Sequence, residues 1–112
     1  MIALSLLETA FIIVIEPGRR HRVVESLAEA QGVQFLCPAC FEKNHGPVGT
    51  HCCLCWFSDH GVSDDEVPTG GRWVPSGAGL EDLSLSPSIM SPSDPGCAGW
   101  HGFIEQGKVR IV

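Results

Sequence analysis

Cys37 and Cys40, in the segment CPAC, are the first pair in this 112-residue chain whose types and spacing could do chemistry. A C-x-x-C turn supplies two thiolates from one backbone bend, which suits a tetrahedral zinc ion; the same spacing also occurs in dithiol redox proteins. Pro38 within the bend fixes one φ angle in advance and so reduces the entropy lost when the ligands are ordered. A structural zinc site needs four protein ligands, so a second pair is required.

Cys97 and His101, in the segment CAGWH, form the best second pair. They lie at the entrance to a predicted C-terminal hairpin, just as the first pair lies at the end of a predicted strand, so two strand ends could converge on one ion. We therefore predict one structural zinc ion, bound by Cys37, Cys40, Cys97 and His101.

A rival set of ligands lies between the two pairs and comprises His45, His51, Cys52, Cys53, Cys55 and His60. If His51 or a cysteine of the segment 52–55 completes the CPAC pair, the site is compact and Cys97 is spare. A second metal ion is a further possibility. Cys52 and Cys53 taken alone are typical of small buried or half-exposed thiols.

The sequence offers no other set of residues typical of an enzyme. A thioredoxin-like CPAC needs a helix directly after it, and the segment 41–44 reaches Gly46 and Pro47 too soon for one. The H-x-E motif of zinc deaminases, the G-x-G-x-x-G motif and the P-loop are all absent. We expect a non-enzymatic protein; the alternative is a metalloenzyme or thiol redox protein with an open site near His51 and Cys55.

The composition of the chain limits the classes of partner that it could bind. The net charge is -6 with only seven basic residues, which argues against nucleic acid as the default partner and weakly favours a protein partner. A homo-oligomer is possible. The apolar segment 1–16 lacks the features of a signal peptide and is too short for a membrane span, so we expect a buried strand region, no membrane partner, and six reduced cysteines in the cytoplasm.

The pattern of apolar residues and turn formers predicts the elements that position these ligands. We expect strands at 11–15, 33–36, 54–57, 72–74 and 83–85, one helix at 22–30, and a hairpin of 100–105 with 108–112. In the first hairpin strand His101 shares a face with Phe103, and Trp100 lies on the other face. The expected fold is a single domain of residues 1–112, α+β and mostly β, with one helix in the N-terminal half and a C-terminal β-hairpin, stabilised by zinc.

Four segments together resemble an uncharacterised family of small Cys/His-rich proteins found in phage and bacterial genomes. These segments are FLCPACF, GPVGTHCCLCWF, GRWVPSGAGLEDLSLSPSI and CAGWHGFIEQGKV, and the resemblance covers residues 33–110. It implies a zinc site on Cys37, Cys40, Cys97 and His101 and no activity. It also implies a phage origin. The closed metal site, the acidic charge and the lack of a catalytic constellation favour an interaction protein, and we expect a phage-encoded accessory protein in a bacterial host, which binds or modulates a host or virion protein, for example as an inhibitor of host defence. This chain differs from many relatives in its C-x3-H spacing and in the Cys52-Cys53 pair.

Overall fold

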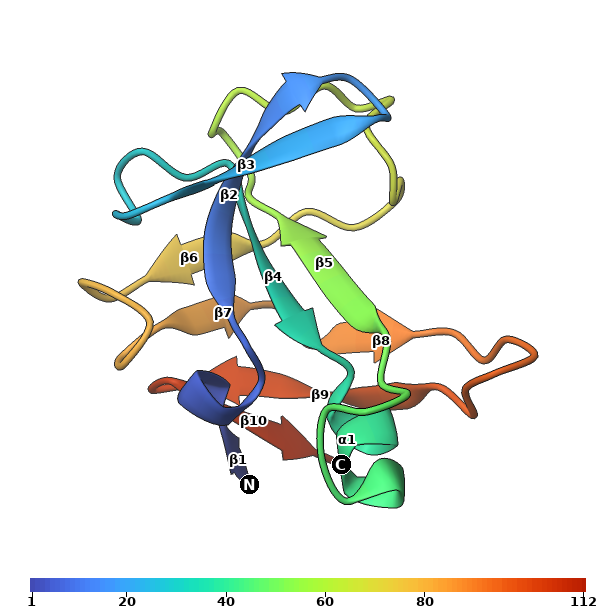
Figure 1. Ribbon diagram of the computed structural model, residues 1–112. Coiled ribbons are helices and arrows are strands. Elements are labelled where there is room, and N and C mark those ends of the chain that lie inside the picture. Colours follow the sequence, from blue (N-terminus) through green and yellow to red (C-terminus); the bar gives the residue numbers. More distant parts are fainter.

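The computed structural model describes residues 1–112 and consists mainly of two four-stranded antiparallel sheets, whose strands cross at a steep angle (Figure 1). The strand order is β3-β2-β4-β5 in the first sheet and β1-β10-β9-β8 in the second. A third, two-stranded sheet joins β6 (Val74–Ser76) to β7 (Ser84–Ser86). The predicted α+β, mostly β, architecture is confirmed.

The first sheet is built from the N-terminal half of the chain. It contains β2 (Ala10–Glu16), β3 (Arg20–Val24), β4 (Gly32–Leu36) and β5 (Cys52–Trp56). The predicted strands at 11–15 and 33–36 correspond to β2 and β4, where branched and aromatic residues favour extended backbone. β5 pairs only with β4, so β5 is an edge strand.

The second sheet is built from both ends of the chain. It contains β1 (Ile2–Ala3), β8 (Ile89–Ser91), β9 (Trp100–Glu105) and β10 (Lys108–Ile111), and a short 3-10 helix, Leu4–Leu6, follows β1. The predicted C-terminal hairpin is confirmed as β9 and β10, with Glu105 opposite Lys108. β8 was not predicted; it pairs only with β9 and so forms one edge of the second sheet.

One hydrophobic core lies between the two sheets. It is a cluster of 18 buried residues that includes Phe35 from β4, and Trp100 and Ile104 from β9. The residues Cys37, Cys40, Cys55 and Cys97 belong to the same cluster. The thiols of the candidate metal ligands therefore face the region where the two sheets pack together.

The predicted helix at 22–30 is wrong. Residues Arg20–Val24 form β3, which pairs with β2 so that Val24 lies opposite Phe11 and Val23 opposite Ile12. The turn at Pro17 and Gly18 brings the chain back along β2, whose free edge offers a ladder of hydrogen bonds. That pairing outweighs the helical spacing of the apolar residues, since helix propensity is a weak preference that tertiary context overrides.

The one α-helix is instead α1 (Pro38–Asn44), which begins inside the CPAC segment. The expectation that no helix follows this segment is wrong, because the helix starts at Pro38 within the segment. Proline suits the first turn of a helix, where a backbone N–H would have no partner within the helix. α1 ends at His45, whose φ of 55° is left-handed. No helix of this fold is long and apolar enough to cross a membrane.

Candidate metal centre

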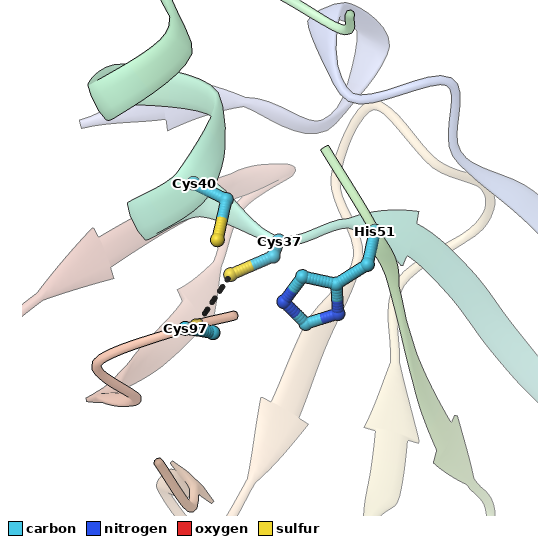
Figure 2. A group of neighbouring side chains, drawn as sticks. All are labelled: Cys37, Cys40, His51 and Cys97. Carbon is cyan, nitrogen blue, oxygen red and sulfur yellow. Dashed lines mark hydrogen bonds between the residues drawn. The ribbon is translucent and has the colours of Figure 1, made fainter. Parts of the chain in front are cut away.

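Four side chains from distant parts of the sequence converge on one point. The ligand atoms of Cys37, Cys40, His51 and Cys97 all lie within 4.8 Å of one another, and Figure 2 shows the three sulfurs and the imidazole ring facing a common centre. The three cysteines are buried and His51 is exposed. This arrangement, called the four-residue cluster below, could hold a metal ion.

Cys37 and Cys40 are placed by the junction between β4 and α1. Cys37 directly follows β4 and is the N-cap residue of α1, where its carbonyl accepts a hydrogen bond from the amide of Phe41 at 2.9 Å. Cys40 lies three residues further on, within the first helical turn. Since residues three apart lie on the same side of a helix, both thiols point toward the same centre.

His51 is placed by the pairing of β4 with β5. Leu36 lies opposite Cys52, and the next residue pair is joined by a hydrogen bond of 2.8 Å from the Cys37 amide to the His51 carbonyl. The ring nitrogen Nδ1 of His51 lies 3.3 Å from the carbonyl oxygen of Cys52 and can only donate to it. That contact favours the tautomer in which Nε2 carries the free lone pair, so Nε2 is the atom available to a metal ion.

Cys97 is placed by a tight turn between β8 and β9. The backbone of Cys97 exchanges hydrogen bonds of 2.8 Å and 3.1 Å with that of Asp94, and its sulfur accepts the amide hydrogen of Gly99 at 3.3 Å. Gly99 has a φ of 79°, and a Cβ atom there would lie 2.7 Å from the carbonyl oxygen of Ser91. Only glycine fits this turn without strain.

The distances within the cluster suit a tetrahedral metal ion. The sulfurs of Cys37 and Cys97 are 3.8 Å apart, which is too long for a disulfide, and all six cysteines are free. A tetrahedron with zinc–sulfur bonds of about 2.3 Å has edges of about 3.8 Å. The Cys37–Cys97 separation therefore matches one edge of such a site.

The side chains of the four-residue cluster change one another's pKa values because they lie close together. The nearby imidazole of His51 lowers the pKa of the Cys97 thiol to about 7, and the Cys97 thiol in turn raises the pKa of His51 above its ordinary value. Burial, with the neighbouring thiols of Cys97 and Cys37, raises the pKa of Cys40 to about 12. A bound cation would reverse this last effect, because metal coordination deprotonates a thiol.

The structure brings together three of the four predicted ligands, Cys37, Cys40 and Cys97, but it does not bring His101 to them. Strand alternation puts Trp100 on the buried face of β9 and His101 on the opposite face. There the Nε2 atom of His101 lies 3.0 Å from the hydroxyl of Ser88. The fourth position of the cluster belongs to His51, a member of the rival set.

The other members of the rival set lie outside the four-residue cluster. Cys52 is exposed, and Cys55 is buried in the core, where burial raises the pKa of its thiol. One signal in the sequence could have identified His51. If the segments 32–36 and 52–56 form an antiparallel pair in this register, Cys37 and His51 face each other at its end.

Comparisons with family models, with curated proteins and with solved structures found no match to this chain. The resemblance to small Cys/His-rich proteins of phage and bacteria therefore stays a prediction.

Proposed function

We propose that this chain is a small non-enzymatic binding protein whose fold is held together by one structural zinc ion in the four-residue cluster. One observation carries the proposal: the cluster joins the two sheets. Cys37, Cys40 and His51 come from the β4–α1–β5 segment of the first sheet, and Cys97 comes from the turn before β9 of the second. A metal ion bound here ties the two halves of the core together.

The donor set favours zinc and a structural role. Three thiolates and one imidazole are typical of structural zinc sites, whereas catalytic zinc sites keep one position for water. With four protein ligands, no position is left for an activated water molecule, so a metal bound in this way does not favour hydrolysis.

The energy of such a site is large compared with the stability of the fold. Structural zinc contributes on the order of 10–16 kcal/mol of apparent binding free energy in small zinc domains. Whole domains are stable by about 5–15 kcal/mol. Removal of the metal should therefore unfold the protein and not merely loosen it.

A groove next to the cluster supports a role in binding another protein. Its volume is about 700 Å³, and its lining includes Leu54 of the edge strand β5 and Met90 of the edge strand β8. By the alternation of antiparallel hydrogen bonding, the backbone N–H and C=O groups of these two residues point away from their paired strands. In this proposal the groove binds an extended segment of a protein partner, which adds to these edges as a strand.

The wider biological role in this proposal is that of a phage-encoded accessory protein in the cytoplasm of a bacterial host. There it binds or modulates a host or virion protein, for example as an inhibitor of host defence. Its support is the resemblance of the four quoted segments, the acidic net charge and the donor set of a closed metal site.

Two substitutions test the metal. Cys40→Ser removes a buried ligand and should abolish both stoichiometric zinc, measured by elemental analysis, and cooperative thermal unfolding. Cys52→Ser, which changes an exposed thiol outside the four-residue cluster, should keep both. Purified wild-type protein without zinc, or a Cys40→Ser variant with a full zinc content, would refute the proposal.

A third substitution tests the partner. Met90 is 68% exposed on the edge of β8, so Met90→Lys should leave the fold intact while a charge on the edge blocks strand addition. Partners captured by the wild type from bacterial lysate should be lost with Met90→Lys. They should be kept with Val48→Lys, which changes another exposed apolar residue, outside the groove. Recovery of the same partners with Met90→Lys would exclude the groove as their binding site.

A further inference from the structure

Two of the proposed zinc ligands face each other across the boundary between the two sheets. The sulfurs of Cys37 and Cys97 lie 3.8 Å apart, although the two residues are 60 positions apart in the sequence (Figure 2). Cys37 directly follows β4 of the first sheet, and Cys97 lies in the turn before β9 of the second. A covalent bond between these two sulfurs would therefore join the same two sheets that the zinc ion joins.

The backbone on both sides of this contact is already held in place. The amide of Cys37 donates to the carbonyl of His51 at 2.8 Å, and the backbone of Cys97 exchanges hydrogen bonds of 2.8 Å and 3.1 Å with that of Asp94. A disulfide needs a sulfur–sulfur distance of about 2.05 Å. We therefore expect rotation of the two cysteine side chains to close the remaining gap, with the packing of the sheets unchanged.

Burial favours a disulfide over two free thiolates at this position. Cys37 is 0% exposed and Cys97 is 6% exposed, and both belong to the hydrophobic core. A thiolate that has lost its metal ion is a costly charge in such surroundings, whereas a disulfide is neutral and apolar. When zinc leaves, the two sulfurs therefore end as protonated thiols without a cross-link or as a disulfide.

The cluster is accessible from the side of His51. The three cysteines are buried, whereas His51 is exposed and lines the groove described above, together with Asp94. Imidazole binds a metal as a neutral ligand, so it can leave the zinc ion and return without a charge being stranded. While it is away, a molecule as small as hydrogen peroxide can reach the bound thiolates from the groove.

We propose that the four-residue cluster is a redox-sensitive switch: hydrogen peroxide oxidises Cys37 and Cys97 to a disulfide, zinc is released, and the disulfide replaces the metal as the link between the two sheets. The inference rests on the proposed zinc site. It gives the 3.8 Å contact a role that Cys40 and His51 do not share, because these two ligands are released as free side chains.

The reaction balances with peroxide as the only oxidant. One thiolate attacks an oxygen of hydrogen peroxide, which breaks the O–O bond and gives a sulfenic acid and a hydroxide ion. The second thiolate attacks that sulfur, forms the S–S bond and displaces a second hydroxide ion. Two electrons have then passed from the two sulfurs to the peroxide, and the two hydroxide ions take up two protons from solvent to give water.

Oxidation and chelation should therefore have opposite effects on the fold. A chelator under reducing conditions removes zinc and leaves separate thiols, so the two sheets lose their cross-link and the protein unfolds. Peroxide removes the same ion but leaves a covalent bond between residues 60 positions apart, which restricts the unfolded chain and so stabilises the fold.

The test starts from full-length wild-type protein whose zinc content has been measured. One equivalent of hydrogen peroxide should release one zinc ion per chain, followed with a chromophoric chelator, and should remove two of the six free thiols. Peptide mapping without reductant should find Cys37 linked to Cys97 and Cys40 still free to be alkylated after denaturation. Thermal unfolding should stay cooperative after oxidation and lose its cooperativity when dithiothreitol and a chelator are added together.

Cys52→Ser is the matched control, because it removes an exposed thiol outside the four-residue cluster. This variant should release zinc and form the same disulfide as the wild type. Zinc-loaded wild type that keeps its zinc in peroxide, that links any other pair of cysteines, or that loses cooperative unfolding on oxidation would overturn the inference while the zinc site stands. Wild type that contains no zinc before peroxide is added would overturn the proposed function, and the inference with it.

Discussion

Replacing His51 by alanine separates the observed site from the one expected from sequence. His51 supplies the only nitrogen ligand of the four-residue cluster, whereas His101 contacts Ser88 on the outer face of β9. We expect His51→Ala to weaken zinc binding strongly and His101→Ala to leave it unchanged. The two variants remove the same side chain from the same small protein, so each serves as the control for the other.

The size of the effect follows from the number of ligands. If about 10–16 kcal/mol of zinc binding is shared by four ligands, each contributes about 2.5–4 kcal/mol. At about 1.4 kcal/mol per tenfold change, His51→Ala should weaken zinc binding by roughly 10²- to 10³-fold. This is an upper bound, because His51 is exposed and water can take its place. His101→Ala loses one hydrogen bond, about 1 kcal/mol of stability, and no zinc affinity.

The assay is competition for zinc with a chromophoric chelator, combined with thermal unfolding of both variants. His51→Ala should release zinc to a chelator that leaves the wild type loaded. The reasoning is refuted if His101→Ala loses zinc while His51→Ala retains wild-type affinity, since that result would restore the ligand set expected from the sequence.

Two further predictions concern the turn at Gly99 and the pH dependence of zinc binding. Gly99→Ala should lower both the melting temperature and the zinc affinity, because its Cβ would lie 2.7 Å from the Ser91 carbonyl oxygen at a positive φ, a strain of about 1–3 kcal/mol. Gly96→Ala is the control and should change neither, since its Cβ would lie 3.8 Å from a side-chain oxygen of Asp94. Zinc affinity should fall as the pH falls, because burial raises the pKa of Cys40 to about 12 and this thiol must release its proton to bind. The fall should steepen below about pH 7, where Cys97 also becomes protonated in the metal-free protein. Competition titrations for zinc at several pH values measure this, and a zinc affinity that does not change with pH would contradict it.

The failure of the helix prediction at 22–30 has a clear physical origin. Val23 and Val24 fit a helical spacing, but they are also β-branched, and the turn at Pro17 and Gly18 offers them the free edge of β2. Whether that edge is free depends on which strand occupies the other side of β2, and this is a tertiary fact. The C-terminal hairpin was predictable because its pairing is local and its turn is marked by Gly107.

The sequence by itself determined two properties of this protein. Its residue pattern indicates a mostly β chain, and the C-x-x-C pair together with a distant third cysteine supplies thiols that favour a metal site. It also determined the alternation of β9, which already separated His101 from the buried Trp100. Only the tertiary structure decided which imidazole joins the thiols. That choice depends on the register of β5 against β4, which places His51 opposite Cys37, and on the packing of the two sheets, which brings Cys97 across the core to meet them. Register and sheet packing are set by long-range contacts, which local residue patterns do not specify.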